Sequence, residues 1–430
     1  MGSMIETLKN AFKIPDLRKK LLFTIGILIV YRLGIRVPVP GIDQEAFTAL
    51  IERFGQLGSF LDIISGGAFK QVSIFAMGIT PYVNASIIMQ LLTVAIPALE
   101  RLQKEGETGR KKIQQMVRYL TVGLAMVQAI AYWYATRMAS SSTLPGFLNA
   151  ILVVVSFTAG TAFIMWLGEQ INEKGIGNGI SLIIFAGIIT GGPNAIKMLF
   201  GYFQNWSVTS NIFVSVIGTA AIIAVFVVVV ALVVFVQSAE RRIPVQYAKK
   251  VVGRKMYGGQ NTYLPIKVNQ AGVIPVIFAI SIVSLPSTLV SLFGGTGPVA
   301  EWFMNFSGNP FYYIFYALLI LGFTFFYSMV QFNPIEIANN LQKNGGFIPG
   351  IRPGRPTSDF IARTARRLNW IDGLFLIVIV LFPVLLSAVT KAQGVWFGGT
   401  AVLIVVGVAI DLVNQLESQM VMRHYKGFLD

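Results

Sequence analysis

The chain has 430 residues, of which 54% are hydrophobic and only 12% are charged. Soluble proteins carry about 25% charged residues, so this composition predicts a membrane protein that crosses the bilayer many times. The formal net charge of +15 indicates an anionic partner or membrane surface, although basic loops that only set topology explain most of it. Cysteine is absent, which excludes disulfides and thiolate–zinc sites.

Apolar runs of about 17–25 residues, long enough to cross a bilayer, recur along the chain. The first run, 21–33, has no small-residue cleavage site and is expected to be a span rather than a cleavable signal peptide. We expect ten spans, near residues 20–36, 77–96, 116–137, 148–168, 179–200, 212–236, 270–293, 311–331, 370–390 and 398–416. An even number of spans places both termini on one side of the membrane. The expected fold class is therefore an all-α polytopic membrane protein.

The distribution of basic residues indicates which side this is. Most of the 34 Lys and Arg residues fall in the N-terminal segment, in alternate loops and in the C-terminal tail. The loops 237–268 and 332–369 are the longest and among the richest in basic residues. Because basic residues accumulate in cytoplasmic loops, both termini are expected in the cytoplasm.

The stretch GGAFKQVSIFAMGITPYVNASIIMQLL, 66–92, cannot be one plain lipid-facing helix. Its two leading glycines each cost a helix about 1 kcal/mol relative to Ala. Lys70 adds a charge, and Pro81 removes a backbone donor. Such a broken segment lies at membrane depth only against protein or a water-filled cavity. We expect a short re-entrant helix over 57–75 and a full span over 77–96; a kinked span without a special role is the alternative.

Enzymatic chemistry finds little support in the residues. The only histidine, His424, lies in the C-terminal tail, which excludes a buried Ser–His pair or a multi-His metal site. No GxxxxGK[ST] loop is present. The run KGIGNGI, 174–180, looks like a glycine-rich nucleotide turn but lacks a βαβ context, so we expect a tight turn that opens the fifth span. No catalytic residue, metal site or cofactor is predicted.

Several long motifs resemble the SecY family of channel subunits of the bacterial Sec translocon. The 66–92 stretch resembles that family's plug and second-helix signature. Four other stretches match as well: GEQINEKGIGNGISLIIFAG at 168–187, the run 241–278 containing LPIKVNQAGVIPVIF, NPIEIANNLQKNGGFIPGIRPG at 333–354, and FGGTAVLIVV at 397–406. The resemblance covers nearly the whole chain. It implies a plasma-membrane channel of two inverted five-helix halves, 1–200 and 201–430, split near 200–211.

The resemblance also implies a pore ring. By motif, the ring positions fall on Ile79, Val83, Ile184, Ile277 and Ile404. All five are aliphatic, and a narrow collar of bulky aliphatic side chains blocks ions by dewetting without binding the substrate. Any one of them alone would more often simply face lipid or the core, so the prediction depends on the joint match.

A plug and a lateral gate follow from the same resemblance. The plug is expected within 57–75, with the candidate residues Leu61, Asp62, Ile63, Ile64, Ser65, Gly66, Gly67 and Phe69. An ordinary extracellular loop helix is the alternative. The gate residues would be Asn84, Gln90, Gln128 and Ser281, on the second, third and seventh spans. Their alternative role is static hydrogen bonding between helices, which is worth about 1 kcal/mol per bond in a membrane.

The resemblance implies partners for the two long basic loops. In SecY-like chains these loops dock the ribosome and the SecA ATPase, and Arg254, Lys255 and Arg352 match positions tied to that docking. SecE and SecG are implied as small membrane subunits, and signal sequences, secretory precursors and the lipid bilayer as further partners. The chain would then be a passive protein-conducting channel that also releases helices sideways into lipid. A secondary transporter is the alternative, but it should carry polar ligands at its midplane, where this chain is expected to be aliphatic.

Overall fold

The computed structural model of the chain describes residues 11–45, 65–136, 145–193, 212–247, 261–293, 309–390 and 399–426, together with residues 197, 200–201, 250–252, 255–257, 298, 302 and 306. Contacts between residues divide the chain into two compact units. The first comprises 1–202, 281–312 and 404–430, and the second 203–280 and 313–403. The first unit thus contains all of the predicted N-terminal half and two later segments.

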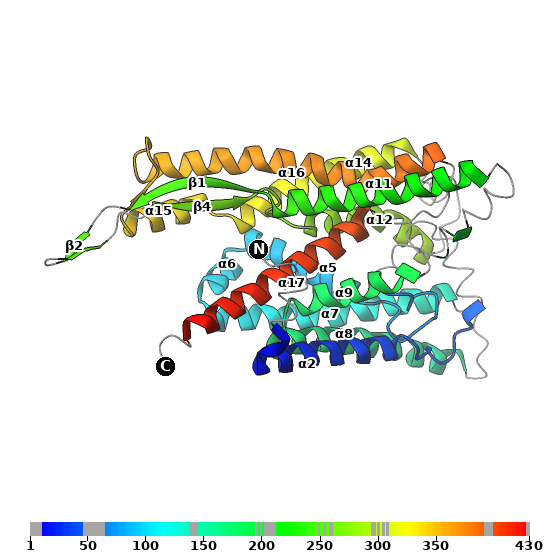
Figure 1. Cartoon of the computed structure of the whole chain (residues 1–430). Coiled ribbons are helices and arrows are strands. Elements are labelled where there is room, and N and C mark those ends of the chain that lie inside the picture. Colours follow the sequence, from blue (N-terminus) through cyan, green and yellow to red (C-terminus); the bar gives the residue numbers. More distant parts are fainter. Residues whose placement is uncertain are drawn as a thin grey trace. The chain divides into compact units, whose positions relative to one another are not determined.

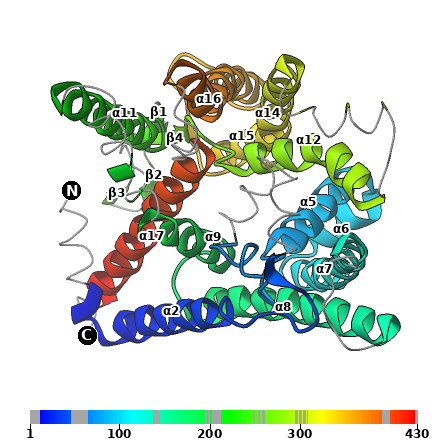
Figure 2. The same ribbon diagram turned by 90° about the vertical axis from the view of Figure 1, so that its right-hand side faces the viewer.

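The first unit is built from helices. They are α2 (Pro15–Gly34), α5 (Thr80–Ala95), α6 (Pro97–Lys104), α7 (Glu107–Thr136), α8 (Gly146–Lys174), α9 (Gly179–Thr190), the second part of α12 (Ile274–Phe293) and most of α17 (Gly399–Lys426). Within it, α8 packs against α2, α7 and α9, and α5 packs against α7 (Figure 2). The predicted tight turn lies at 175–178, before α9, and Asn178 caps that helix by accepting hydrogen bonds from the backbone N–H groups of Ile180 and Ser181.

The second unit combines helices with a small sheet (Figure 1). Its helices are α11 (Ile212–Ser238), α14 (Pro310–Gln331), α15 (Pro334–Lys343) and α16 (Arg355–Thr390), and the beginning of α12 also belongs to it. Its strands are β1 (Glu240–Tyr247), β2 (Lys250–Val252), β3 (Lys255–Tyr257), β4 (Asn261–Lys267) and β5 (Gly346–Phe347).

The predicted helical membrane fold is confirmed, because each of the ten apolar runs carries a helix. Among the described residues, five helical stretches are long and apolar enough to span a bilayer: Gly146–Lys174 (α8), Val216–Ser238 (within α11), Pro310–Lys343 (α14 and α15), Arg355–Leu385 (within α16) and Gly399–Met420 (within α17). The pair α5 and α6 forms a sixth candidate, bent by 101° at its break. Two further apolar stretches are shorter, α9 and Ile274–Val283, the first part of α12. The chain is thus a multi-pass membrane protein.

The two long loops contain the sheet, which the sequence analysis did not predict. β1 pairs antiparallel with β4, from Glu240↔Lys267 to Gln246↔Asn261. β5, which belongs to the second loop, pairs with the other edge of β1 through Gln246↔Phe347 and Tyr247↔Gly346. A buried apolar cluster joins the sheet to α16; its members are Ile243, Val245, Ile266, Ile348, Ile361 and Leu368. The two loops are therefore one folded body.

Candidate functional site

The segment from Ser65 to Ile79, called the turn segment here, is the described part of the predicted plug region and its link to α5. It runs as consecutive turns up to α5. The helix expected over 57–75 is therefore wrong for residues 65–75, because Gly66 and Gly67 take left-handed φ angles of +69° and +85°, which a helix cannot contain. Leu61, Asp62, Ile63 and Ile64 lie outside the described residues.

Backbone bonds fix the turn segment against the chain that follows α2. Pro38 and Ser73 form an isolated antiparallel bridge. On either side of it, Val39 N donates to the Val72 carbonyl at 2.8 Å, and Ile74 N donates to the Val37 carbonyl at 3.0 Å. Val72 has a φ of 49°. A β-branched residue rarely adopts that conformation, so the surrounding contacts hold the backbone in a strained state.

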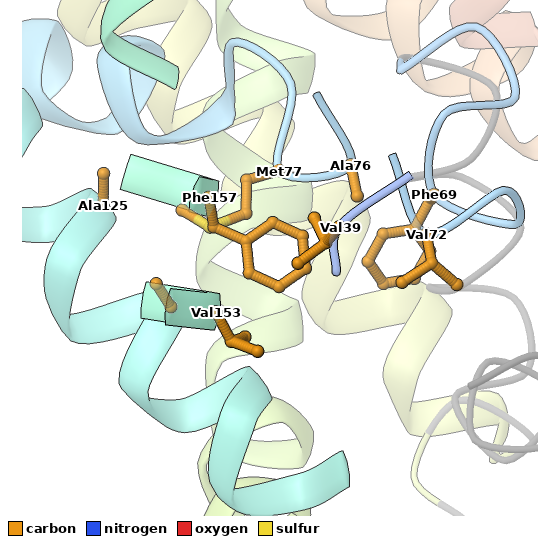
Figure 3. Close-up of a cluster of buried hydrophobic side chains, with 9 residues drawn as sticks. Val39, Phe69, Val72, Ala76, Met77, Ala125, Val153 and Phe157 are labelled. Atoms are coloured by element: carbon orange, nitrogen blue, oxygen red, sulfur yellow. The ribbon is translucent and has the colours of Figure 1, made fainter. Parts of the chain in front are cut away.

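One side of the turn segment is buried against α7 and α8 (Figure 3). Phe69, Val72, Ala76 and Met77 of the segment pack with Val39, Ala125, Ala129, Val153 and Phe157. Phe75 stacks on Tyr31 of α2 at a centroid distance of 6.0 Å and on Phe163 of α8 at the same distance. The apolar character predicted for this stretch thus serves burial in protein rather than contact with lipid.

The five predicted ring positions lie on four different helices or at their ends. Ile79 is the N-cap of α5 and Val83 follows one turn later; Ile184 lies on α9, Ile277 on α12 and Ile404 on α17. Ile79, Ile184 and Ile404 are buried, while Val83 and Ile277 are partly buried. Ile277 belongs to the second unit and the other four to the first. That the five side chains form one ring stays a prediction.

The predicted gate residues are distributed over three helices of the first unit. Asn84 and Gln90 lie on α5, Gln128 on α7 and Ser281 on α12. Gln90 Nε2 donates to Ser86 Oγ on its own helix at 3.2 Å, so that bond does not join helices. Their role as a gate stays a prediction.

The predicted docking residues belong to the sheet-forming loops of the second unit. Lys255 lies in β3, Arg254 lies outside the described residues, and Arg352 is exposed in the loop between β5 and α16. Thr357 Oγ1 donates to the carbonyl of Arg352 at 2.9 Å, and the N–H groups of Thr357 and Ser358 both bond to the Gly354 carbonyl. The first turn of α16 therefore fixes the loop that presents the Arg352 side chain.

Sequence reasoning missed two polar contacts within the first unit, one between helices and one between a helix and the turn segment. Arg118 of α7 forms an ion pair with Glu169 of α8, with Nε 2.6 Å from Oε1. Arg32 of α2 donates from Nη1 to the Gly66 carbonyl at 2.9 Å. The positive-inside rule accounts for neither contact, because it concerns only the side of the membrane on which a charge lies. The position of Arg32 inside a predicted span was a signal that it has a protein partner.

Comparison with known proteins identifies the family. The family model described as SecY matches residues 73–413. The "Protein translocase subunit SecY" of Streptomyces scabiei is 45% identical over 99% of this chain and 100% of its own length.

Two solved structures share the fold. One is a SecY protein whose plug domain stabilises the closed state of the translocation channel and maintains a membrane seal. It aligns with a TM-score of 0.62 at 21% identity over 94% of this chain and 92% of its own. The other, Sec61 in the canine ribosome-channel complex from the endoplasmic reticulum, gives 0.59 at 19% identity over 94% and 93%. With the family model and the full-length relative, this chain belongs to the SecY family.

Proposed function

We propose that the chain is the channel-forming subunit of a protein translocase. Unfolded polypeptides pass through it across the plasma membrane, and hydrophobic helices leave it sideways into lipid. The observation that carries this proposal is the full-length similarity to a protein translocase subunit, at 45% identity. The positive-inside pattern supports a cytoplasmic location for both termini.

The aliphatic residues Ile79, Val83, Ile184, Ile277 and Ile404 form the pore ring in this proposal. Burial of Ile79, Ile184 and Ile404 supports it, because a side chain that only faced lipid would be exposed in the isolated chain. A collar of such side chains seals against ions at rest and yields to an extended polypeptide. The same chemistry disfavours a secondary transporter, whose midplane needs polar ligands for its substrate and coupling ion.

In this proposal, a partner protein supplies the energy for translocation, and it binds to the sheet-forming loops. Arg254, Lys255 and Arg352 contact SecA or the ribosome, and SecE and SecG complete the membrane complex. The structurally similar Sec61 is part of a ribosome-channel complex, which supports a ribosome-binding role for this chain. The join of β5 to β1 supports a docking surface that moves as one piece.

A disulfide test uses the absence of cysteine in this chain. Val83→Cys would be the only cysteine, and a secretory precursor with one mid-chain cysteine would be stalled during SecA- and ATP-driven transport. We expect a disulfide that requires both ATP and a functional signal sequence. Ile88→Cys is the control, since Ile88 lies on the same helix and is 37% exposed.

The possible results distinguish a wrong assignment of the ring residues from a wrong channel function. Transport without a disulfide at position 83, 184 or 277 would show that the ring is misplaced. Equal disulfide yields at positions 83 and 88 would show that the polypeptide runs along the outside of α5. If the unmodified chain, with its membrane partners, does not transport the precursor at all, the proposed channel function is wrong.

A further inference from the structure

The last turn of α2 makes two consecutive hydrogen bonds to the beginning of the turn segment. Tyr31 Oη donates to the Ser65 carbonyl at 3.1 Å, and Arg32 Nη1 donates to the Gly66 carbonyl at 2.9 Å. Neighbouring donors on one helix thus hold neighbouring carbonyls 34 residues away. Arg32 lies in the last turn of α2, and the Gly66 carbonyl gives its charge a specific hydrogen-bond partner in the protein.

The helix α9 closes on the same point from another side. A Cβ atom on Gly66 would lie 2.9 Å from the Gly187 Cα, so only glycine allows this approach. Thr190 Oγ1, which bonds to the Gly187 carbonyl at 2.6 Å, also lies 3.5 Å from the Gly66 carbonyl oxygen. Gly66 is therefore held between α2 and α9, two elements that are distant from it in the sequence.

Further contacts dock the turn segment onto α2 and α8. Ser73 Oγ donates to the Gly34 carbonyl at 3.1 Å, and the Phe75 ring fills the space that the missing side chain of Gly34 leaves. Gly160 of α8 likewise leaves space for the Ile74 carbonyl. Polar bonds to carbonyls and contacts at glycines can separate without unfolding a helix, unlike a continuous α-helical connection.

We propose that Tyr31 and Arg32 form a latch that holds Ser65 and Gly66, at the beginning of the turn segment, in the resting channel, and that release of these two carbonyls is a step of opening. This inference rests on the proposed channel function and adds two positioning residues to it. Arg32 is the stronger element, because a hydrogen bond from a charged donor is about twice as strong as a neutral one. The Tyr31 ring also stacks on Phe75 of the turn segment, which adds a second contact between the two elements.

The test compares Arg32→Gln and Tyr31→Phe with the unmodified chain in proteoliposomes that contain the complete translocase. Tyr31→Phe removes one oxygen atom and retains the ring that stacks on Phe75. Two readouts are measured: chloride efflux at rest, and SecA-driven import of a precursor whose signal sequence is defective. For Arg32→Gln we expect both to rise on the order of tenfold, with a smaller rise for Tyr31→Phe. Import of a normal precursor should persist in both variants.

Arg36→Gln is the matched control, because Arg36 is an exposed arginine one turn further along that carries the same charge. It should change neither readout. A rise of equal size in Arg36→Gln and Arg32→Gln would overturn the latch, since charge alone would then explain the effect. Arg32→Lys, which keeps a charged donor, should restore at least part of the seal.

The possible results also distinguish failure of the latch proposal from failure of the proposed channel function. If the unmodified translocase imports the normal precursor but neither variant leaks or relaxes the signal requirement, the latch is wrong while the channel stands. If no precursor is imported by the unmodified protein, the channel function itself fails. Should Arg32→Gln not fold in detergent, Tyr31→Phe decides: a well-folded variant with wild-type chloride efflux and signal requirement overturns the latch.

Discussion

Arg118 Nε lies 2.6 Å from Glu169 Oε1 and so joins α7 to α8, two of the helices against which the turn segment packs. The Glu169 side chain is 8% exposed and that of Arg118 41% exposed, so the pair is partly shielded from water. Tyr82 of α5 lies within electrostatic range of both charges. This ion pair therefore holds α7, which carries the predicted gate residue Gln128, against α8.

Arg118→Gln should lower the free energy of unfolding by roughly 1–3 kcal/mol, because it leaves a buried carboxylate without its cation. The measurement is thermal unfolding of the purified chain in detergent. Arg110→Gln, an exposed change on the same helix, serves as the control and should shift stability by less than about 0.5 kcal/mol. Equal shifts for the two variants would mean that the ion pair contributes nothing beyond a surface charge.

Gly179→Ala should destabilise the first unit strongly. A Cβ atom at Gly179 would overlap the backbone carbonyl of Gly168, where α9 approaches α8, and a backbone group cannot swing aside as a side chain can. We expect a loss of roughly 2–4 kcal/mol in detergent unfolding. Gly123→Ala on α7 is the matched control, since nothing lies within 4 Å of its added Cβ.

Gly123→Ala should leave the stability unchanged or raise it by about 0.5–1 kcal/mol, because alanine is more favourable than glycine in a helix interior. If Gly179→Ala were as well tolerated as Gly123→Ala, the close approach of α8 and α9 would be wrong.

Thr357→Val should weaken docking of the proposed motor SecA without unfolding the second unit. Thr357 Oγ1 is the donor that fixes the Arg352 carbonyl, and valine keeps the volume while it removes that bond. One hydrogen bond is worth about 1 kcal/mol, so we expect about a fivefold weaker SecA affinity in a binding assay with proteoliposomes.

Thr364→Val is the control for that experiment. Its hydroxyl also donates at 2.9 Å, but to the Phe360 carbonyl of its own helix. SecA affinity should therefore remain unchanged in Thr364→Val. An equal loss of affinity in both variants would show that the Arg352 loop is not the element that the hydrogen bond supports.

The helices were predictable from the sequence, whereas the sheet and the turn segment were missed for different reasons. A run of some 20 apolar residues in a membrane has to be helical, because only a helix satisfies every backbone polar group within the run. The sequence of β1 carries a weak strand signal, because the aliphatic residues Ile243 and Val245 are two positions apart, which is the period of a strand. In the structure both are buried and their neighbours are partly or fully exposed. The length and charge of the loops obscured this signal.

The turn segment could not be predicted locally, since its shape depends on partners far along the chain. Gly66 and Gly67 indicated a break in the helix. They did not indicate that Arg32 of α2 and Gly187 of α9 would both contact Gly66. For the predicted site, the motif match proposed Ile79, Ile184 and Ile404 as ring positions, and their role stays a prediction. Their burial is a property of packing among helices and needed the structure.

Asp372 offers a test of packing in the second unit. It is 1% exposed on α16, and neither carboxylate oxygen has a hydrogen-bond partner in the described part of the chain. The adjacent Gly373 faces Leu321 of α14. Burying a polar group without a partner costs about 1–3 kcal/mol.

Asp372→Leu should therefore raise the free energy of unfolding of the isolated chain by about 1–3 kcal/mol, because it removes that cost and adds apolar contact. Asp372→Asn, which keeps the size and still needs partners, should gain less. The measurement is thermal unfolding of both variants in the same detergent. A lower melting temperature for Asp372→Leu would contradict this expectation. It would show that the carboxyl group has a stabilising partner in the folded chain.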